Sequence, residues 1–190
     1  MDIPIAHGYK EPKVYEKLNG KLILMPRPHA DHIELQWVIE SELRQYMKDK
    51  MCRVFNEIDV FISGDNVIPD VCVLCDLDKL RNGRIYGAPD LIVEVTSPST
   101  KHRDIGYKKS LYEKTGVKEY WIINPMDKSV EIYTLTKTNQ YNCHLMTQLV
   151  PDYERAGLTA DELKEIPIVI TSQLLEGFSI SIYDMFKKIP

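Results

Sequence analysis

Apolar and polar residues follow two different patterns near the start of the chain. In residues 14–25, two short runs typical of strands flank Asn19-Gly20, and this segment predicts a β-hairpin because both turn residues tolerate positive φ. Residues 30–49 have a helical period, with polar residues between the apolar ones, so they predict an amphipathic helix. The residues that recur at helical spacing are Leu35, Ile39, Leu43 and Tyr46.

A strand, a helix and a second strand follow one another in the middle of the chain. The run 90–96 is apolar on both faces, which is typical of a strand inside a covered sheet. A helix over 104–115, ended by Gly116, and an apolar strand at 117–124 complete an expected βαβ unit. The other predicted elements are strands at 53–62 and 67–75, hairpins near 129–135 and 141–150, a strand near 166–170, and helices near 159–165 and 182–188.

The composition is that of one globular α/β domain. The chain has 190 residues, 44% of them hydrophobic and 27% charged, which suffices for a core without disulfides or metal ions. We expect a leader at 1–13 and the domain at 14–190. The net charge is −4, so a polyanion would have to meet a local basic patch. No apolar run approaches the ~20 residues that span a bilayer. The polar N-terminus is unlike a signal peptide, so we expect a cytoplasmic location.

The four cysteines form no zinc or redox motif. Cys72 and Cys75 make a Cys-x-x-Cys pair, but a structural zinc site needs a second pair, which Cys52 and Cys143 do not supply. The pair lies in a run that predicts a strand, where a spacing of three puts the two sulfurs on opposite faces. We therefore expect reduced, buried and inert cysteines.

Glu94 lies inside the apolar run Leu91–Val95 and needs an explanation. An ionised carboxylate left unpaired in such a strand would cost several kcal/mol, so it must be protonated, paired or bound to a cation. Asp90 shares its face but stands ~13 Å away along the strand, too far to share an ion with it. Asp70 opens a second apolar strand. If the two strands are neighbours, Asp70 and Glu94 converge.

Two interpretations of these acids are open. Two carboxylates that converge in a dry place make a reasonable Mg²⁺ site, with water completing the octahedron. Alternatively, Asp70 ends a turn and Glu94 has a single lysine or arginine partner. The segment that follows is basic, and on its helix Asp104, Lys108 and Tyr112 share one face. A cation from this helix would lie close to both acids and could also meet a phosphate.

Several blocks of the sequence resemble the Uma-type ("Uma two") restriction endonucleases. They are YEKLNGKLILMP, IPDVCVL, GAPDLIVEVTSPST, DIGYKKSLY, GVKEYWIINP, VEIYTL and LLEGFSISIYDMF. The resemblance covers residues 14–187. It implies the Pro-Asp-(Asp/Glu)-x-Lys nuclease superfamily, whose fold is a mixed central sheet flanked by helices, with two acids on adjacent strands.

The family pattern assigns roles to particular residues. The resemblance implies that Asp70 and Glu94 hold Mg²⁺ (or Mn²⁺), together with the backbone carbonyl of Val95. The superfamily lysine lies two residues beyond the second acid, where this chain has Thr96. The Uma-type pattern places it on the next helix, at Lys108, where it would assist the attacking water or stabilise charge.

The resemblance also implies less central residues. His32, on the first helix, fits the Uma-type pattern and would contact phosphate or a metal-binding carboxylate. It could equally be a helix N-terminal residue at the edge of the core. Glu40 on the same helix is a fallback acid ligand. Independently of the resemblance, the basic segment after Glu94 supplies the expected nucleic-acid contacts, Lys101, Arg103 and Lys109.

The resulting hypothesis is a metal-dependent endonuclease that hydrolyses phosphodiester bonds in DNA. A homodimer is expected, because double-strand cleavage usually needs two centres. Two alternatives stay open: a nucleic-acid-binding module that kept the fold and lost cleavage, and a structural protein in which Glu94 and Lys108 form a buried ion pair.

Overall fold

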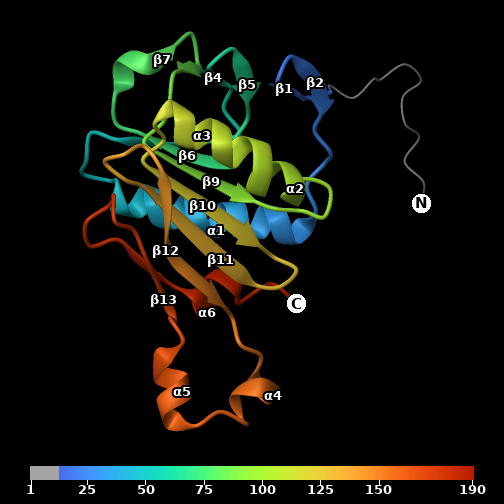
Figure 1. The fold of residues 1–190 in the computed structure, drawn as a ribbon, viewed down its shortest axis with the longest axis vertical. Coiled ribbons are helices and arrows are strands. Elements are labelled where there is room, and N and C mark those ends of the chain that lie inside the picture. The colour runs from blue at the N-terminus through green and yellow to red at the C-terminus, as the bar shows by residue number, and fades with distance from the viewer. Residues whose placement is uncertain (1–12) are drawn as a thin grey trace, which may run out of the picture.

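The computed structural model describes residues 13–190, so the predicted leader lies outside the described residues except for Lys13. The central sheet is mixed and has six strands (Figure 1). They are β3 (Arg53–Asn56), β6 (Val71–Leu74), β9 (Leu91–Val95), β10 (Glu119–Asn124), β11 (Ser129–Leu135) and β12 (Tyr141–Gln148). Their order is β12-β11-β10-β9-β6-β3, with β9 and β10 parallel and the other neighbours antiparallel.

A second sheet of six short strands lies beside the first and has the order β2-β1-β5-β4-β8-β7. Its strands are β1 (Tyr15–Leu18), β2 (Lys21–Leu24), β4 (Val60–Ile62), β5 (Asp65–Val67), β7 (Leu80–Arg81) and β8 (Arg84–Tyr86). A third sheet pairs β13 (Val169–Thr171) with β14 (Ser179–Ser181). The predicted mixed central sheet is therefore confirmed, with two smaller sheets added to it.

Helix α1 (Ala30–Tyr46) and the helical segment 101–115 cover opposite faces of the central sheet (Figure 1). The described helices are α1, the 3₁₀ helix η1 (Leu77–Lys79), α2 (Lys101–Arg103), the π-helix η2 (Asp104–Lys108), α3 (Lys109–Thr115), α4 (Asp152–Arg155), α5 (Ala160–Glu165) and α6 (Ile182–Phe186). No helix among residues 13–190 is long and apolar enough to cross a membrane.

Both faces of β9 are covered, which explains its continuous apolar run. On one face, Val93 packs in the core cluster that contains Leu35 and Ile39 of α1. On the other face, Ile92 packs with Leu111 and the ring of Tyr112 from α3. The strand, the helical segment 101–115 and β10 form the predicted βαβ unit, and Gly116 ends the helix at φ +88°.

The structure divides two of the predicted strands. The single strand expected at 53–62 is wrong, because Glu57 has a φ of +48° and turns the chain from β3 into β4. The strand expected at 67–75 is split into β5 and β6 around Pro69, which has no backbone N–H to donate to a sheet. Asp70 therefore lies directly before β6, in the short connection between the second sheet and the central sheet.

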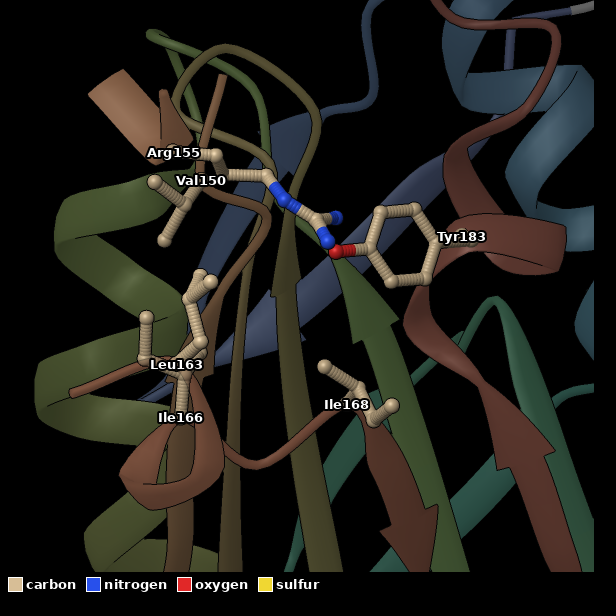
Figure 2. Close-up of a pocket in the computed structure, with 6 residues that line it drawn as sticks. All are labelled: Val150, Arg155, Leu163, Ile166, Ile168 and Tyr183. Atoms are coloured by element: carbon tan, nitrogen blue, oxygen red, sulfur yellow. The ribbon is translucent and has the colours of Figure 1, made fainter. Parts of the chain in front are cut away.

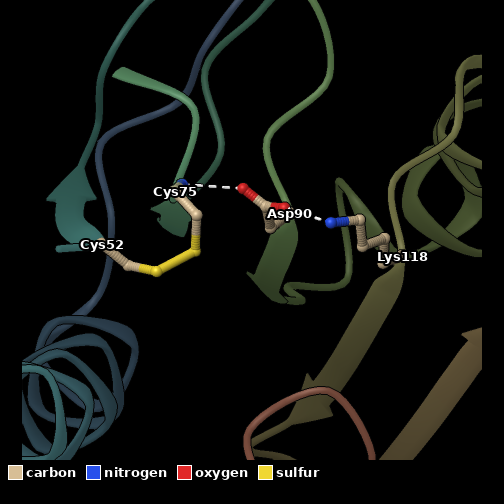
Figure 3. The surroundings of a disulfide bond; sticks show 4 residues. All are labelled: Cys52, Cys75, Asp90 and Lys118. Atoms are coloured by element: carbon tan, nitrogen blue, oxygen red, sulfur yellow. Dashed lines mark hydrogen bonds and ion pairs between the residues drawn. A yellow bond between two sulfur atoms is a disulfide. The ribbon is translucent and has the colours of Figure 1, made fainter. Parts of the chain in front are cut away.

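The expectation of reduced, buried cysteines is wrong for three of the four. Cys52 and Cys75 form a disulfide (Figure 3). Cys52 precedes Arg53 and Cys75 follows Leu74, and these two residues are a register pair of β3 and β6, so the cysteines lie opposite each other at the ends of neighbouring antiparallel strands. Cys143 is an exposed free thiol, and Cys72 alone is both buried and free, as expected. Cys72 and Cys75 do lie on opposite faces, since they pack in different core clusters.

The segment between β12 and β13 projects from the central sheet and carries α4 and α5 (Figure 1). Helix α5 begins with a capping box between Thr159 and Glu162. Where this segment meets α6, the Arg155 guanidinium lies 4.9 Å from the Tyr183 ring centroid. A cavity of about 80 Å³ opens beside them (Figure 2), lined by Val150, Arg155, Leu163, Ile166, Ile168 and Tyr183. This lining offers no carboxylate for a metal ion.

Candidate active site

The structure brings Asp70 and Glu94 side by side on adjacent strands. The last register pair of β6 and β9 joins Val71 to Val93, so the next residues along the two strands are Asp70 and Glu94. The backbone N–H of Val95 donates to Asp70 Oδ2 over 2.6 Å. Both acids are buried, and Glu94 is 4% exposed. The conditional expectation that the two acids converge is confirmed.

Asp90 belongs to the other end of the same strand, as expected. Its carboxylate accepts hydrogen bonds from the backbone N–H of Cys75 and from Lys118, each over 2.7 Å (Figure 3).

Two donors from the helical segment meet one oxygen of Glu94. The Lys108 ammonium lies 3.0 Å from Oε1, and the Tyr112 hydroxyl donates to the same atom over 2.8 Å. Neither contact uses Oε2. Glu94 is therefore held from one side, and its second oxygen is free of these two donors.

Lys108 is enclosed by acids. Its Nζ lies 2.8 Å from Glu16, 3.0 Å from Glu94 and 3.6 Å from Asp104. The residue is 3% exposed, so this is a buried cluster rather than the weak surface pair that an i, i+4 spacing usually gives. The predicted common face of Asp104, Lys108 and Tyr112 is confirmed, because all three are buried toward the sheet.

The local structure explains how a lysine from the helix reaches the strand. The chain leaves β9 through residues 96–100 and re-enters helical structure at Lys101. Residues 104–108 form a π-helix, which is wider than an α-helix and is common at functional sites. At the position of the usual superfamily lysine, Thr96 is 1% exposed. Among the described residues its hydroxyl has no hydrogen-bond partner.

His32 approaches the acids from α1. Its Nε2 lies 3.2 Å from Asp70 Oδ1. Four residues later on the same helix face, the Gln36 amide donates to the backbone carbonyl of Asp70 over 3.0 Å. Within residues 13–190, Nδ1 of His32 is buried without a hydrogen-bond partner. His32 therefore contacts a candidate metal-binding carboxylate, which favours the functional interpretation of this residue over the edge-of-core one.

The electrostatics of the cluster follow from burial and from the number of acids. Burial raises the pKa of Glu94 well above its ordinary value; the Lys108 charge opposes this rise, and the neighbouring acids add to it. Burial also raises the pKa of Asp104, again against the effect of Lys108. For Lys108 the acids outweigh burial and raise its pKa, so it stays charged. Burial lowers the pKa of His32, but Asp70 and Glu57 more than compensate, so it is raised above 6.5.

The predicted nucleic-acid contacts differ in their surroundings. Lys101 is half-buried and lies 3.6 Å from Asp127. Lys109 lies 3.4 Å from the centroid of the Tyr133 ring on β11, and burial lowers its pKa. Arg103 is half-buried, and in the described part of the chain its Nε has no hydrogen-bond partner.

Glu40, the fallback acid, makes a 2.7 Å ion pair with Arg44 on its own helix. In the structure of residues 13–190 it makes no hydrogen bond or ion pair with Asp70 or Glu94.

Sequence reasoning missed Glu16. It lies on β1, where the burial pattern alternates and places Glu16 and Leu18 inward. That alternation was the available signal, since it puts an acid on the buried face of a predicted hairpin strand. The partners of Glu16 come from segments far along the chain, so no local pattern could have named them.

The donor set fits a hard divalent cation. Carboxylate and carbonyl oxygens are the ligands that Mg²⁺ prefers, and Mg²⁺ usually keeps several waters. In residues 13–190, no group of three or more His, Cys, Asp or Glu side chains could hold a metal ion. A smaller set, Asp70, the second oxygen of Glu94 and the Val95 carbonyl, could supply three oxygen ligands, with water for the remaining positions.

Comparison with known families agrees with this architecture. A family model, Uma2, described as "Putative restriction endonuclease", matches residues 7–158. The match covers 152 of the 190 residues. The chain belongs to the Uma2 family.

Individual relatives are distant. The "Uncharacterized protein slr1290" of Synechocystis sp. is 24% identical to this Uma2 chain over 123 residues, which is 63% of the chain and 65% of that protein. The match thus spans less than two thirds of the relative's length. The crystal structure of a "putative nuclease belonging to DUF820" from Anabaena variabilis aligns with a TM-score of 0.70. It is 22% identical, and the alignment covers 93% of this chain and 91% of that one. Together with the family match, it confirms the restriction-endonuclease-like α/β fold.

Proposed function

We propose that this Uma2 chain is a metal-dependent endonuclease that hydrolyses phosphodiester bonds in DNA. The observation that carries the proposal is the pair of buried acids on adjacent strands, Asp70 and Glu94, with the Lys108 ammonium 3.0 Å from Glu94. Family membership supports a nuclease. Metal dependence, the DNA substrate and the residue roles are parts of the proposal.

Each residue has a role that follows from its contacts. Asp70, Glu94 and the Val95 carbonyl would hold Mg²⁺ or Mn²⁺, which when bound supplies Lewis-acid stabilisation of negative charge and lowers the pKa of water. His32 fixes the orientation of Asp70. Lys108 holds one oxygen of Glu94 and adds positive charge where the phosphate gains negative charge. Because burial among acids keeps it protonated, Lys108 acts by orientation and charge rather than as a general base.

The substrate would lie along the basic start of the helical segment. Lys101 and Arg103 lie in α2, the first helix after β9, and supply candidate contacts to phosphate. Lys109 packs on Tyr133 and is the least available of the three predicted contacts.

A plasmid-nicking assay with Mg²⁺ or Mn²⁺ tests the proposal directly. We expect Glu94→Gln and Asp70→Asn each to lose at least ~100-fold in rate, because each removes a metal-holding charge at nearly constant shape. Asp90→Asn is a matched control, since Asp90 is a buried acid at the other end of β9. It should retain nicking within a few-fold. Equal nicking by wild type and Glu94→Gln would reject the proposal.

The presence of Thr96 where the superfamily lysine is expected favours one other candidate, a nucleic-acid-binding module without cleavage. It predicts DNA binding that weakens with salt and with loss of Lys101, and no product in the same assay.

We also propose a homodimer, because cleavage of both strands needs two centres. Analytical ultracentrifugation should then give a mass of twice 22.0 kDa. A mass near 22.0 kDa at working concentration would contradict the dimer and leave the nuclease proposal standing.

A further inference from the structure

Glu16 is a buried acid that the proposed reaction does not yet use. It lies on β1 and is 2% exposed, while Tyr15 and Lys17 on either side of it are exposed. A buried carboxylate needs hydrogen bonds and a compensating charge. Glu16 has both, and they come from two elements that carry residues of the proposed active site.

The two contacts of Glu16 connect those elements. Its Oε1 lies 2.8 Å from the Lys108 ammonium and accepts the backbone N–H of Ile68 over 3.0 Å. Ile68 precedes Pro69 and Asp70 in the break between β5 and β6. Glu16 thus connects the segment that leads into the first candidate metal ligand to the lysine that holds the second.

The Lys108 ammonium is divided among three acids, and Glu16 is the nearest. The distances are 2.8 Å to Glu16, 3.0 Å to Glu94 and 3.6 Å to Asp104. An ammonium has three N–H donors. Glu16 also adds a negative charge near Glu94, and this charge favours the binding of a divalent cation at the oxygen of Glu94 that Lys108 does not contact.

The need to attach the β1–β2 hairpin to the rest of the domain does not by itself explain a buried charge at position 16. The turn of the hairpin is fastened separately, because the Asn19 backbone N–H donates to Asp65 Oδ1 over 2.9 Å and the Tyr107 hydroxyl donates to Asp65 Oδ2 over 2.5 Å. A neutral side chain at position 16 would pack on the same face without the cost of burying a carboxylate.

We propose that Glu16 is a positioning residue of the site: it holds the Lys108 ammonium on the Oε1 side of Glu94 and leaves Oε2 for a divalent cation. The inference rests on the proposed function, since it assumes that Glu94 binds metal. It predicts that Glu16→Gln makes the surroundings of Glu94 more positive by one charge. Lys108 then shifts its bonding to Glu94, and divalent-cation affinity falls about tenfold.

Calorimetric titration with MnCl₂ alone, without DNA, tests this inference. Glu119→Gln is a matched control, because Glu119 is also fully buried and also connects two segments, accepting from Trp121 on one oxygen and from Gln173 and Leu174 on the other. Both variants should melt below wild type. Only Glu16→Gln should bind Mn²⁺ at least five times more weakly than wild type, and Glu119→Gln should bind it within twofold.

A double variant separates the charge argument from a folding defect. Glu16→Gln with Lys108→Met removes one charge of each sign, so the net charge around Glu94 is that of wild type, and Mn²⁺ affinity should return to within threefold of wild type. The double variant leaves no unpaired charge at position 16, but Glu94 and Asp104 still lose Lys108, so its Tm should fall below that of wild type. Its Mn²⁺ affinity is therefore measured well below that Tm.

The outcomes distinguish this inference from the proposed function. Wild-type protein that binds no Mn²⁺ overturns both. Wild type that binds Mn²⁺, with Glu16→Gln of equal affinity, overturns the inference and leaves the nuclease proposal intact. A double variant more than tenfold weaker than wild type overturns it as well, because Glu16 would then act by a route other than its charge balance with Lys108.

Discussion

Replacement of Lys108 by methionine should strongly destabilise the protein. The ammonium is the cation that Glu16, Glu94 and Asp104 share at 2.8, 3.0 and 3.6 Å. Methionine has a similar length but no charge, so three buried carboxylates would lose their common partner. Breaking a buried ion pair by removing one member costs about 3–5 kcal/mol. For a chain of this length, about 2–4 °C per kcal/mol turns that cost into a Tm lower by about 6–20 °C.

Thermal unfolding followed by circular dichroism measures this effect, first in EDTA and then with increasing Mg²⁺. Lys118→Met is the matched control, because Lys118 pairs with Asp90 at 2.7 Å but its side chain is 59% exposed. Exposed ion pairs contribute about 0–1 kcal/mol, so this variant should melt within a few degrees of wild type. The loss in Lys108→Met should also shrink as the pH falls, because Glu94 and Asp104, whose pKa values are raised, take up protons and no longer need a counter-charge.

The magnesium titration separates a nuclease site from a structural ion pair. A ligand that binds the native state stabilises it by about 2.7 kcal/mol at a hundredfold excess over Kd. A metal site therefore predicts a rise in wild-type Tm with Mg²⁺, and a larger rise for Lys108→Met, whose acids have lost their competing cation. A structural cluster predicts no rise. If Lys108→Met melted within about 3 °C of wild type in EDTA, the assignment of Lys108 as the counter-charge of these acids would be refuted.

Two further predictions concern pH and the disulfide. The pKa of His32 is raised above its ordinary value of 6.5, so its pairing with Asp70 stabilises the fold fully below pH ~6.5 and is lost as the pH rises through the raised pKa. The difference in unfolding free energy between wild type and His32→Gln, from urea titrations, should thus decrease from pH ~6 to ~8.5, and a constant difference would contradict the pairing. Cys52 and Cys75 are 23 residues apart, and the loop they close predicts that reduction lowers the unfolding free energy by about 3 kcal/mol. Free-thiol counts of four in unreduced, denatured protein would show that the bond is absent.

The sequence was sufficient to predict the acids because they violate a local pattern. Glu94 lies in a run of residues that otherwise requires burial, and Asp70 opens the next apolar strand, so both stand out without knowledge of their neighbours. The βαβ unit and the N-terminal hairpin were predicted for similar reasons, since spacing and turn residues are local properties. The position of Lys108 came from the family resemblance, and the helical repeat showed only that it shares a face with Asp104.

The features that sequence analysis missed depend on which strands pair. Cys52 meets Cys75 because β3 and β6 are neighbours in a particular register, and no spacing along the chain specifies that register. Glu16 meets Lys108 because the second sheet, which contains β1, packs beside the helical segment 101–115. The strand expected at 53–62 was broken by Glu57, whose positive φ is uncommon for a residue with a side chain.

The buried cluster around Lys108 contains more acids than bases, which is the charge balance expected of a cation site. Its buried carboxylates belong to Glu16, Asp70, Glu94 and Asp104. They face one ammonium, on Lys108, and one imidazole, on His32, so two negative charges are unbalanced even when His32 is protonated. The raised pKa values of Glu94 and Asp104 are the response expected of acids that share too little positive charge. A divalent cation would match that deficit and release any proton that Glu94 holds, so Mn²⁺ affinity should increase with pH.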